Sequence, residues 1–371
     1  MKLLIGGSPC THWSIAQTKN RETEASGIGW ELFLNYRIAR DKYKPDYFLY
    51  ENNKSMSPAI RTQITAELGV EPVLINSALV SAQNRQRLYW VGRRNPDGTY
   101  SQVPVEQPED KGSLLRDILE SGVCWREKGY ALTASNHSAT AEDMIARRQR
   151  NGAAEPIRIG TIENDAKKQD FDSQQYRVYS PDGKSVTLCG QGGGLGAKTG
   201  LYAVPVIPDG EGQFVIKAAD GKQMPVYEVR GGRIIIKGKT YPIKLADGFY
   251  IIRKLTVREC MRLQTVPETY AFPVSPSQAY KMLGNGWTVD VIAHIMSHFE
   301  GLTTEPVEVL SMYDGMSCGH IAMDKLGAEI TAYYATEIDK YAIQTTQHNF
   351  PETIQLGDAF QVRNDDWRVE K

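Results

Sequence analysis

The sequence predicts an α/β protein whose sheet is at least partly parallel, joined to a smaller module rich in β-strands and loops. Two observations predict the α/β part. Short apolar runs alternate with helical patterns over residues 1–95, and the alternation returns from residue 307 onwards. Residues 96–255 differ, because Gly and Pro are frequent there and short β runs alternate with turns. A length of 371 residues suits two domains, or one large domain with an insertion.

The first segment of the chain places polar side chains at the ends of predicted strands. Strands are predicted at residues 3–5, 47–50, 73–75 and 88–91. A glycine turn at residues 6–10 follows the first strand and ends at Cys10, and Glu51 and Asn52 follow the second strand. A helix between these strands carries its apolar side chains on one face, at Leu32, Phe33, Tyr36 and Ala39.

Helix signals return after the β-rich stretch. Two β runs come first, at residues 233–237 and 249–252. Thr256 and Glu259 then have the spacing of a capping box. Ser275-Pro276 repeats the start signal with Pro at the first helical position, and Gly284 ends that helix. The next helix has its apolar stripe at Val289, Ile292, Met296 and Phe299.

The α/β pattern resumes at the carboxyl end. Strands are predicted at residues 307–313, 330–336 and 353–356. A glycine turn at residues 314–319 opens a helix after the first of these strands. Glu337 ends the next strand, about 20 residues beyond the turn, which suits a carboxylate that pairs with the hydroxyls of a ribose. By itself such a turn is weak evidence for a nucleotide site.

Composition excludes several classes of protein. Hydrophobic residues at 41% and charged residues at 23% are enough to bury a core, so global disorder or a coiled coil is not expected. No apolar run approaches the roughly 18–20 residues of a membrane helix, and Gly6 comes too early for a signal peptide. Five scattered cysteines favour free thiols in a reducing compartment, so we expect a cytoplasmic protein.

The net charge of −1 conceals two regions of opposite sign. Residues 222–262 hold ten Lys and Arg against three Asp and Glu, a net of 10 − 3 = +7. Residues 301–371 hold five against twelve, a net of 5 − 12 = −7. These are either two solvated surfaces, or a basic region for a polyanion joined to a domain for a small molecule. The neutral total therefore does not exclude nucleic acid.

Cys10 is a candidate nucleophile, although most lone cysteines are inert core residues. Glu51 lies at a second strand end, and Arg85 and Arg87 directly precede a third strand. Because the carboxyl ends of strands in an open α/β sheet share one crevice, the thiol and the carboxylate could converge there. A nearby guanidinium would lower the pKa of the thiol from about 8.5 and favour a thiolate nucleophile.

Six blocks together resemble the ordered signature motifs of the DNA cytosine-5 methyltransferases. They are Gly6-Gly7-Ser8-Pro9-Cys10, Glu51-Asn52, Gln83-x-Arg85-x-Arg87, Arg258-Glu259-x-x-Arg262-Leu263-Gln264, Gly284-Asn285-Gly286-Trp287-Thr288-Val289 and Tyr313-Asp314-Gly315-x-x-x-Gly319. In detail they most resemble the vertebrate de novo enzymes and their phage-borne relatives. The resemblance implies a Rossmann-like, S-adenosylmethionine-dependent methyltransferase fold. It also implies a catalytic domain at 1–95 and 277–371 and a target-recognition domain at 96–276.

The resemblance implies a covalent mechanism on a cytosine flipped out of double-stranded DNA. Cys10 would attack C6, so that C5 can take a methyl group. Glu51 would protonate or hydrogen-bond N3, and Asn52 would position it. Arg85 would hold the base carbonyl and favour the thiolate, while Arg87 would support the site or a phosphate.

The cofactor that the resemblance implies is S-adenosylmethionine. Glu337 would take the ribose hydroxyls, Ile338 would pack on the adenine, and Asp358 would accept from its amino group. The other cofactor residues would be Pro9, Asn285, Gly286, Trp287, Val289, Tyr313, Asp314, Gly315, Met316, Ser317 and Gly319, with Trp287 alternatively a plain core side chain. The loop at residues 11–29 is placed to close over the base. DNA contacts are expected from Ser14, Gln17, Lys198, Arg233 and Arg258.

The order of the blocks departs from the family pattern. In the usual arrangement the cofactor glycine turn precedes the cysteine block, whereas here residues 307–371 carry the cofactor blocks at the carboxyl end. Joining Lys371 to Met1 would restore the family order. The sequence therefore predicts a circular permutation, cut between the third and fourth strands of the family arrangement.

Three further sequence features and two alternative functions stand beside the methyltransferase resemblance. Residues 192–199 nearly spell a P-loop, but they lack the glycine before the lysine. His294 and His298 share a helix face without a third ligand, so no metal is expected. Residues 147–150 are a solvated charge run or a phosphate contact. Two other functions stay open: methylation of a structured RNA, and a non-catalytic DNA-binding or regulatory role. Relatives of the second kind would be expected to lose the cysteine, the glutamate or the cofactor turn.

Overall fold

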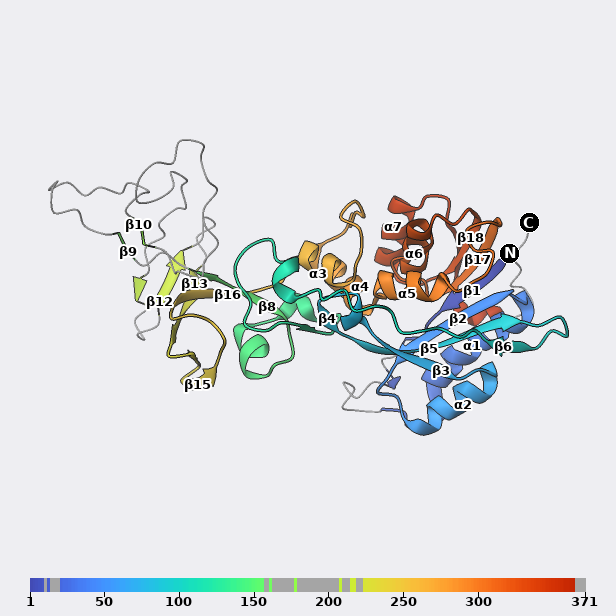
Figure 1. Ribbon diagram of the computed structural model, residues 1–371, viewed down its shortest axis with the longest axis horizontal. Helices are drawn as coiled ribbons and strands as arrows, with labels where there is room; N and C mark the ends of the chain where they lie inside the picture. The colour runs from blue at the N-terminus through green and yellow to red at the C-terminus, as the bar shows by residue number, and fades with distance from the viewer. Residues whose placement is uncertain are drawn as a thin grey trace. The chain divides into compact units, whose positions relative to one another are not determined.

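The computed structural model describes residues 1–9, 12–13, 21–156, 160–161, 177–178, 207–208, 214–217 and 223–363 (Figure 1). The chain divides into two compact units: unit 1 comprises residues 1–113, 131–134 and 260–371, and unit 2 comprises 114–130 and 135–259. Residues 96–113 and 260–276, predicted to belong to the recognition domain, thus fold with unit 1. They do so because Val103 N donates to Val91 O, and Gln264 bonds to Gln83.

Unit 1 is built on one sheet with the strand order β19-β18-β17-β1-β2-β5-β3, and β6 pairs with β5. The first five strands in this order are parallel, whereas β5 is antiparallel to both β2 and β3. The strands are β1 (Lys2–Gly6), β2 (Tyr47–Asn53), β3 (Pro72–Asn76), β5 (Gln86–Arg94), β6 (Tyr100–Gln102), β17 (Val307–Met312), β18 (Ile330–Thr336) and β19 (Ile354–Gly357). The partly parallel sheet and its seven predicted strands are confirmed, with strand ends within three residues of the prediction.

Helices cover both faces of this sheet (Figure 1). Helices α1 (Gly27–Tyr43) and α2 (Pro58–Leu68) pack on one face, where Phe33 and Ile64 join Leu4 in a single apolar cluster. On the other face a Cβ at Gly319 of α6 (Cys318–Leu326) would lie 2.2 Å from Ile5 Cδ1, so the glycine lets this helix approach β1. The remaining α-helices in the described residues are α3 (Val257–Leu263), α4 (Pro276–Asn285), α5 (Val289–Met296) and α7 (Lys340–Asn349).

The predicted helix starts are confirmed in their hydrogen bonds. Thr256 N donates to Glu259 Oε2 at 2.8 Å and Glu259 N donates to Thr256 Oγ1 at 3.1 Å, which is a reciprocal capping box at the start of α3. Pro276 is the first residue of α4. That helix ends at Asn285 rather than at Gly284.

Unit 2 contains an antiparallel sheet. Its order is β11-β12-β13-β14-β15, and β16 pairs with both β13 and β8. The strands are β8 (Gly152–Pro156), β11 (Ile207–Pro208), β12 (Phe214–Lys217), β13 (Gln223–Arg230), β14 (Arg233–Ile236), β15 (Lys239–Pro242) and β16 (Gly248–Lys254). Trp125, Met144, Ile234 and Tyr250 belong to its apolar core. The predicted β runs at 233–237 and 249–252 are confirmed as β14 and β16.

Each described helix is too short or too polar to cross a membrane. Within the same residues no group of three or more His, Cys, Asp and Glu side chains is arranged to hold a metal ion. His294 and His298 instead contact each other, with ring centroids 5.0 Å apart, and His298 Nδ1 bonds to the His294 carbonyl at 2.8 Å.

Candidate active site

A cavity of about 500 Å³ in unit 1 brings the two ends of the chain together. Gly7, Pro9 and Glu51, from the amino-terminal part, line it beside Glu337 and Asp358 from the carboxyl-terminal part. These residues follow or end strands that are parallel neighbours in the sheet. The position is the crevice at the carboxyl ends of parallel strands, where α/β proteins bind ligands, and the volume suits a small molecule.

Two glycines allow the chain to approach its neighbours at this crevice. A Cβ at Gly6 would lie 2.6 Å from the carbonyl oxygen of Met312 in β17. A Cβ at Gly7 would lie 2.8 Å from the Glu51 carbonyl oxygen and 2.9 Å from Glu51 Oε2. Any side chain at either position would displace backbone or the carboxylate. The Gly6-Gly7 pair is thus required for the close packing of β1 against its neighbours.

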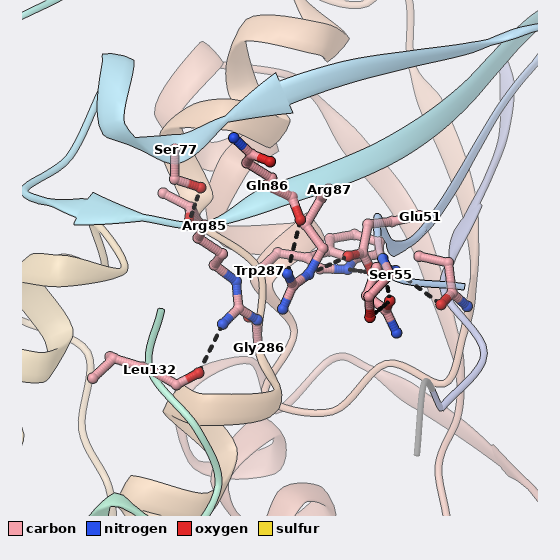
Figure 2. Close-up of polar contacts among 12 residues, drawn as sticks. Glu51, Ser55, Ser77, Arg85, Gln86, Arg87, Leu132, Gly286 and Trp287 are labelled. Atoms are coloured by element: carbon pink, nitrogen blue, oxygen red, sulfur yellow. Dashed lines mark hydrogen bonds and ion pairs between the residues drawn. The ribbon is translucent and has the colours of Figure 1, made fainter. Parts of the chain in front are cut away.

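Glu51 is held by two side chains from distant segments. Arg87 Nε lies 3.0 Å from Glu51 Oε1, and Trp287 Nε1 donates to Glu51 Oε2 at 3.0 Å. Figure 2 shows these side chains converging on the carboxylate. Only 12% of the Glu51 side chain is exposed, so the carboxylate is largely removed from water. All three residues line the cavity.

Arg85 lies in the same cavity wall but has a different set of partners. Its guanidinium donates to the carbonyl oxygen of Leu132 at 3.0 Å (Figure 2). It also donates to the carbonyl oxygens of Gly284 at 3.2 Å and Gly286 at 2.8 Å. The residue is 3% exposed. The sequence predicted that Arg85 holds the base and that Arg87 supports it. The geometry instead places Arg87 beside Glu51 and makes Arg85 a scaffold for the turn after α4.

Asn52 contacts the turn that leads to Cys10 rather than the Glu51 side chain. Its amide donates to the Ser8 carbonyl and to the Tyr50 hydroxyl, each at 3.2 Å. Ser8 Oγ and the Tyr50 hydroxyl lie 2.7 Å apart and complete a buried cluster. The described contacts of the Asn52 amide thus tie it to the Ser8-Pro9 turn, and its predicted role in positioning Glu51 stays a prediction.

Glu337 is fixed by the backbone. Its carboxylate accepts N–H groups from Gly315, Ile338 and Asp339, each at 2.8 Å. Three amide donors hold both oxygens in place before any ligand arrives, and a carboxylate oxygen has capacity for further donors. Glu337 directly follows β18, at the strand end where the sequence placed it, and lines the cavity.

Asp314 is satisfied from within the protein. It accepts hydrogen bonds from the hydroxyls of Ser311 at 2.6 Å and Tyr333 at 2.7 Å, and also from Ser317. Burial raises the pKa of Asp314, and these three hydroxyl donors only partly offset the effect of burial. The turn around it is strained, because Tyr313 has φ 60° and Ser317 has φ 57°. Such strain is a feature of ligand-binding turns.

The rest of the cofactor side offers one exposed apolar surface. Ile338 is 74% exposed although it is a large hydrophobic residue, and it lines the cavity next to Glu337. Asp358 and Phe360 line it as well, and Phe360 N donates to Asp358 Oδ1 at 3.0 Å. Phe360 was not predicted from the sequence. It follows Asp358 by two residues, so an aromatic residue just past the third strand could have indicated it.

The other predicted residues fall into four groups. The cavity is also lined by Asn285, Gly286, Tyr313, Gly315, Met316 and Gly319. Ser317 and Val289 are 0% exposed and pack behind the wall, which corrects their prediction as cofactor contacts. Cys10, Ser14, Gln17, Lys198 and the P-loop-like residues 192–199 lie outside the described residues. In unit 2, Arg233 is exposed on β14, and Arg258 forms an ion pair with Glu120 at 3.2 Å.

Several lining residues were not predicted. His12 and Leu32 line the cavity from the segment around α1, and Lys281 and Asp339 line it from α4 and the start of α7. Lys281 Nζ and Asp339 Oδ2 form an ion pair at 2.6 Å. The signal for Asp339 was available, because Asp is favoured at the N-cap and its side chain accepts from Tyr341 N.

A partly parallel sheet with a cavity at its carboxyl edge, and a carboxylate there held by three backbone amides, are typical of α/β enzymes that bind a nucleoside-containing cofactor. The model of the C-5 cytosine-specific DNA methylase family matches residues 1–300, and the chain belongs to that family. The protein is therefore a DNA cytosine-5 methyltransferase, and its methyl donor is S-adenosylmethionine.

Individual relatives are distant. The chain is 23% identical over 307 residues to the type II methyltransferase M.HhaI of Haemophilus parahaemolyticus, covering 79% of this chain and 74% of that protein. It is 26% identical over 317 residues to the orphan methyltransferase M.SPBetaI of Bacillus phage SPbeta, covering 71% and 68%. A solved structure of a putative DNA modification methyltransferase encoded within an E. coli prophage has 16% identity and a TM-score of 0.39, over 82% of this chain and 79% of that one.

Proposed function

We propose that this enzyme methylates C5 of a cytosine flipped out of double-stranded DNA, through a covalent bond between Cys10 and C6. The observation that carries the proposal is that one cavity is lined by the Glu51–Arg87 pair on one side and by Glu337 and Ile338 on the other. Pro9, which precedes Cys10 in the sequence, lines the same cavity.

The covalent step makes C5 reactive. As the Cys10 thiolate forms a bond to C6, the C5=C6 electron pair shifts to C4=C5, the N3=C4 pair shifts onto N3, and N3 takes a proton from Glu51. This leaves enamine character at C5, and S-adenosylmethionine supplies an electrophilic methyl group. Loss of the C5 proton and departure of the thiolate restore the C5=C6 bond, and N3 returns its proton to Glu51.

Each side chain has a task that its contacts support. Glu51 works at N3, and Arg87 fixes its orientation and faces the base carbonyl. Asn52 fixes the Ser8 carbonyl and thereby the direction in which the chain enters the nucleophile position. Arg85 supports the wall through the carbonyls of Gly284 and Gly286. This preorganisation lowers the reorganisation that the reaction requires.

The residues present fit S-adenosylmethionine. The Glu337 carboxylate, held by three backbone amides, would take the two ribose hydroxyls, and the exposed Ile338 would cover one face of the adenine. Asp358 would accept from the adenine amino group, and Tyr313, Gly315 and Met316 would line the methionine end.

Unit 2 is the proposed target-recognition domain. The segment at 222–262, most of which belongs to it, carries the +7 charge that a polyanion would attract. Arg233 projects from β14 as an exposed cation suited to a DNA phosphate. The target base cannot be reached inside a duplex, so it must be flipped out, at a cost of a few kcal/mol.

The test compares substrates and traps the intermediate. Labelled S-adenosylmethionine is supplied with duplex DNA of random sequence or with tRNA. We expect label in DNA, and label in RNA alone would favour the RNA alternative. Duplex containing 5-fluorocytosine should form an adduct that survives denaturing electrophoresis. Cys10→Ala should abolish both signals. A wild-type protein without adduct and without methylation would instead favour a non-catalytic, DNA-binding relative.

We also propose that the chain is circularly permuted. Three observations support this: β17, β18 and β19 come last in the chain, β17 pairs with β1, and the family match ends at residue 300. Counting strands from β17 gives the doubly wound order 3-2-1-4-5 for the parallel part of the sheet. A relinked variant that begins before β17 and joins residue 371 to Met1 should keep the adduct-forming activity. Its failure to fold, with the parent stable, would contradict the permutation.

A further inference from the structure

The Trp287 indole makes a hydrogen bond to the Glu51 carboxylate. Its Nε1–H donates to Glu51 Oε2 at 3.0 Å, while Arg87 Nε reaches Glu51 Oε1 at the same distance. The two donors come from segments far apart in the sequence: Arg87 lies in β5, and Trp287 lies in the turn between α4 and α5. Figure 2 shows Trp287 beside Glu51 and Arg87.

One donor on each oxygen defines the plane of a carboxylate. A single ion pair with Arg87 would leave the group free to turn about its last bond, because only one oxygen would be fixed. The position of a Cβ at Gly7, 2.9 Å from Oε2, marks how little space remains on that side. Trp287 therefore determines where the proton-carrying oxygen lies relative to the base.

The backbone on both sides of Trp287 is itself fixed by buried side chains. Arg85 donates to the carbonyls of Gly284 and Gly286, and Gln264 Nε2 donates to the Gly286 carbonyl at 3.1 Å. On the other side Thr288 Oγ1 donates to Gln264 Oε1 at 2.9 Å and accepts from the Ser77 hydroxyl at 2.9 Å. These groups hold the indole in place, since the turn that carries it cannot shift without breaking several buried hydrogen bonds.

We infer that Trp287 is a positioning residue for Glu51, and that its role as part of the cofactor wall is secondary. The inference rests on the proposed function, because it assigns Trp287 to the carboxylate that acts at N3. It also explains why the same turn lines the cofactor cavity through Asn285 and Gly286: one rigid segment sets both the cofactor wall and the proton donor.

The test removes the indole N–H and keeps an aromatic ring, with Trp287→Phe. A lost hydrogen bond to a charged group should lower the single-turnover rate of methylation by about 10- to 100-fold. The affinity for S-adenosylmethionine, measured by titration calorimetry, should stay within about twofold. The same titration shows that the variant is folded. A loss of cofactor affinity equal to the loss of rate would overturn the inference.

A second readout needs no cofactor. Addition of Cys10 to C6 lets C5 take a proton from water and then lose one, so DNA tritiated at C5 of cytosine should release tritium without S-adenosylmethionine. Trp287→Phe should slow this release by the same factor as methylation. Unchanged release would mean that Trp287 does not act through Glu51.

Two further variants make the outcome specific. In a Glu51→Gln background, Trp287→Phe should add no further loss, because a residue that acts only through Glu51 has nothing left to position. If the rate losses of Trp287→Phe and Glu51→Gln were fully additive, the inference would be wrong. Trp90→Phe is the matched control. The buried indole of Trp90 in β5 donates to Thr65 Oγ1 of α2 at 2.9 Å, and the loss of this bond should leave the methylation rate unchanged. If the wild type neither methylates DNA nor releases tritium, it is the proposed function that fails.

Discussion

The two sides of the cavity hold their carboxylates by different means. Glu337 accepts three backbone N–H groups, two of them from the residues that follow it. Glu51 accepts from two side chains, Arg87 at 87 − 51 = 36 residues away and Trp287 at 236 residues away. The side of the cavity around Glu337, which we call the cofactor side, is thus held by backbone amides. The side around Glu51, which we call the base side, depends on single side chains from distant segments. Substitutions should therefore affect the two sides differently.

The largest effect should come from the base side. Glu51→Gln keeps the shape but removes the proton that N3 takes, and general acid–base groups contribute about 10²- to 10⁴-fold. We expect the single-turnover methylation rate to fall by a factor in that range. Cofactor affinity should not change, because Glu337 is untouched.

Glu51→Gln also tests whether the cofactor side and the base side are independent. A parallel loss of cofactor affinity in Glu51→Gln would mean that the base side also shapes the cofactor side. The control is Glu308→Gln, near the start of β17. The Glu308 side chain accepts from the Tyr43 hydroxyl at 3.1 Å, and its replacement should leave the methylation rate unaltered.

The same difference explains how much of the site could be predicted from the sequence. Glu337 was identified because its partners are local: a strand end and a glycine turn at a fixed spacing. The position of Glu51 was also predicted, but its partners were not. Both Arg85 and Arg87 precede the strand predicted at residues 88–91, and residues two apart share a face in a regular strand, so the sequence offered no means to choose which of them pairs with Glu51. Arg85 instead falls between β4 (Gln83–Asn84) and β5, where that alternation is interrupted.

In the fold, too, local features could be predicted from the sequence and long-range pairings could not. Local signals, such as the Thr256 capping box and the Pro276 helix start, were predicted and confirmed. The insertion of antiparallel β5 between β2 and β3 was not, because apolar periodicity locates strands without naming their neighbours. Domain limits moved for a similar reason. Gln264 belongs to unit 1 through its buried hydrogen bond to Gln83, 181 residues away.

The second prediction concerns Arg85, which serves both sides through the turn after α4. Arg85→Met keeps the length of the side chain but leaves three buried carbonyls, those of Leu132, Gly284 and Gly286, without this donor. Leaving a buried acceptor without its donor costs about 1–3 kcal/mol. We expect a lower melting temperature, measured by calorimetry, together with weaker cofactor binding and a slower reaction.

Arg87→Met is the matched variant for this prediction. Arg87 is 18% exposed at its side chain, and the partner that concerns catalysis is Glu51. Its loss should slow methylation while changing the melting temperature far less than Arg85→Met does. Equal melting temperatures for the two variants would contradict the separation of scaffold and site.

The third prediction tests the cofactor side alone. Glu337→Gln replaces one carboxylate oxygen with an amide that cannot accept from Gly315 N or from a ribose hydroxyl. Hydrogen bonds to a charged group are worth about 1.5–3 kcal/mol, so cofactor affinity should fall roughly 10- to 100-fold. At saturating S-adenosylmethionine the rate should recover to near the wild-type value. A rate that stays low at saturation would show that Glu337 also shapes the base side.

The smallest effect should come from Asp290 in α5, away from both sides of the cavity. It pairs with Lys111 at 2.7 Å and with Lys325 of α6. Burial opposes ionisation, but the two ammonium groups outweigh it, and the pKa of Asp290 is lowered. A lowered carboxyl pKa contributes stability above the unfolded value of about 4, and that stability is lost as pH falls through the folded pKa.

Asp290→Asn should therefore destabilise the protein at pH 7 by about 1 kcal/mol, the scale of partly exposed ion pairs, and should cost much less near pH 3. The measurement is urea unfolding at both pH values, with cofactor affinity and methylation rate followed at pH 7. Both functional readouts should match the wild type, because the ion pairs tie α5 to α6 and to Lys111 without reaching Glu51 or Glu337. An equal loss of stability at both pH values would assign the effect to packing rather than to charge.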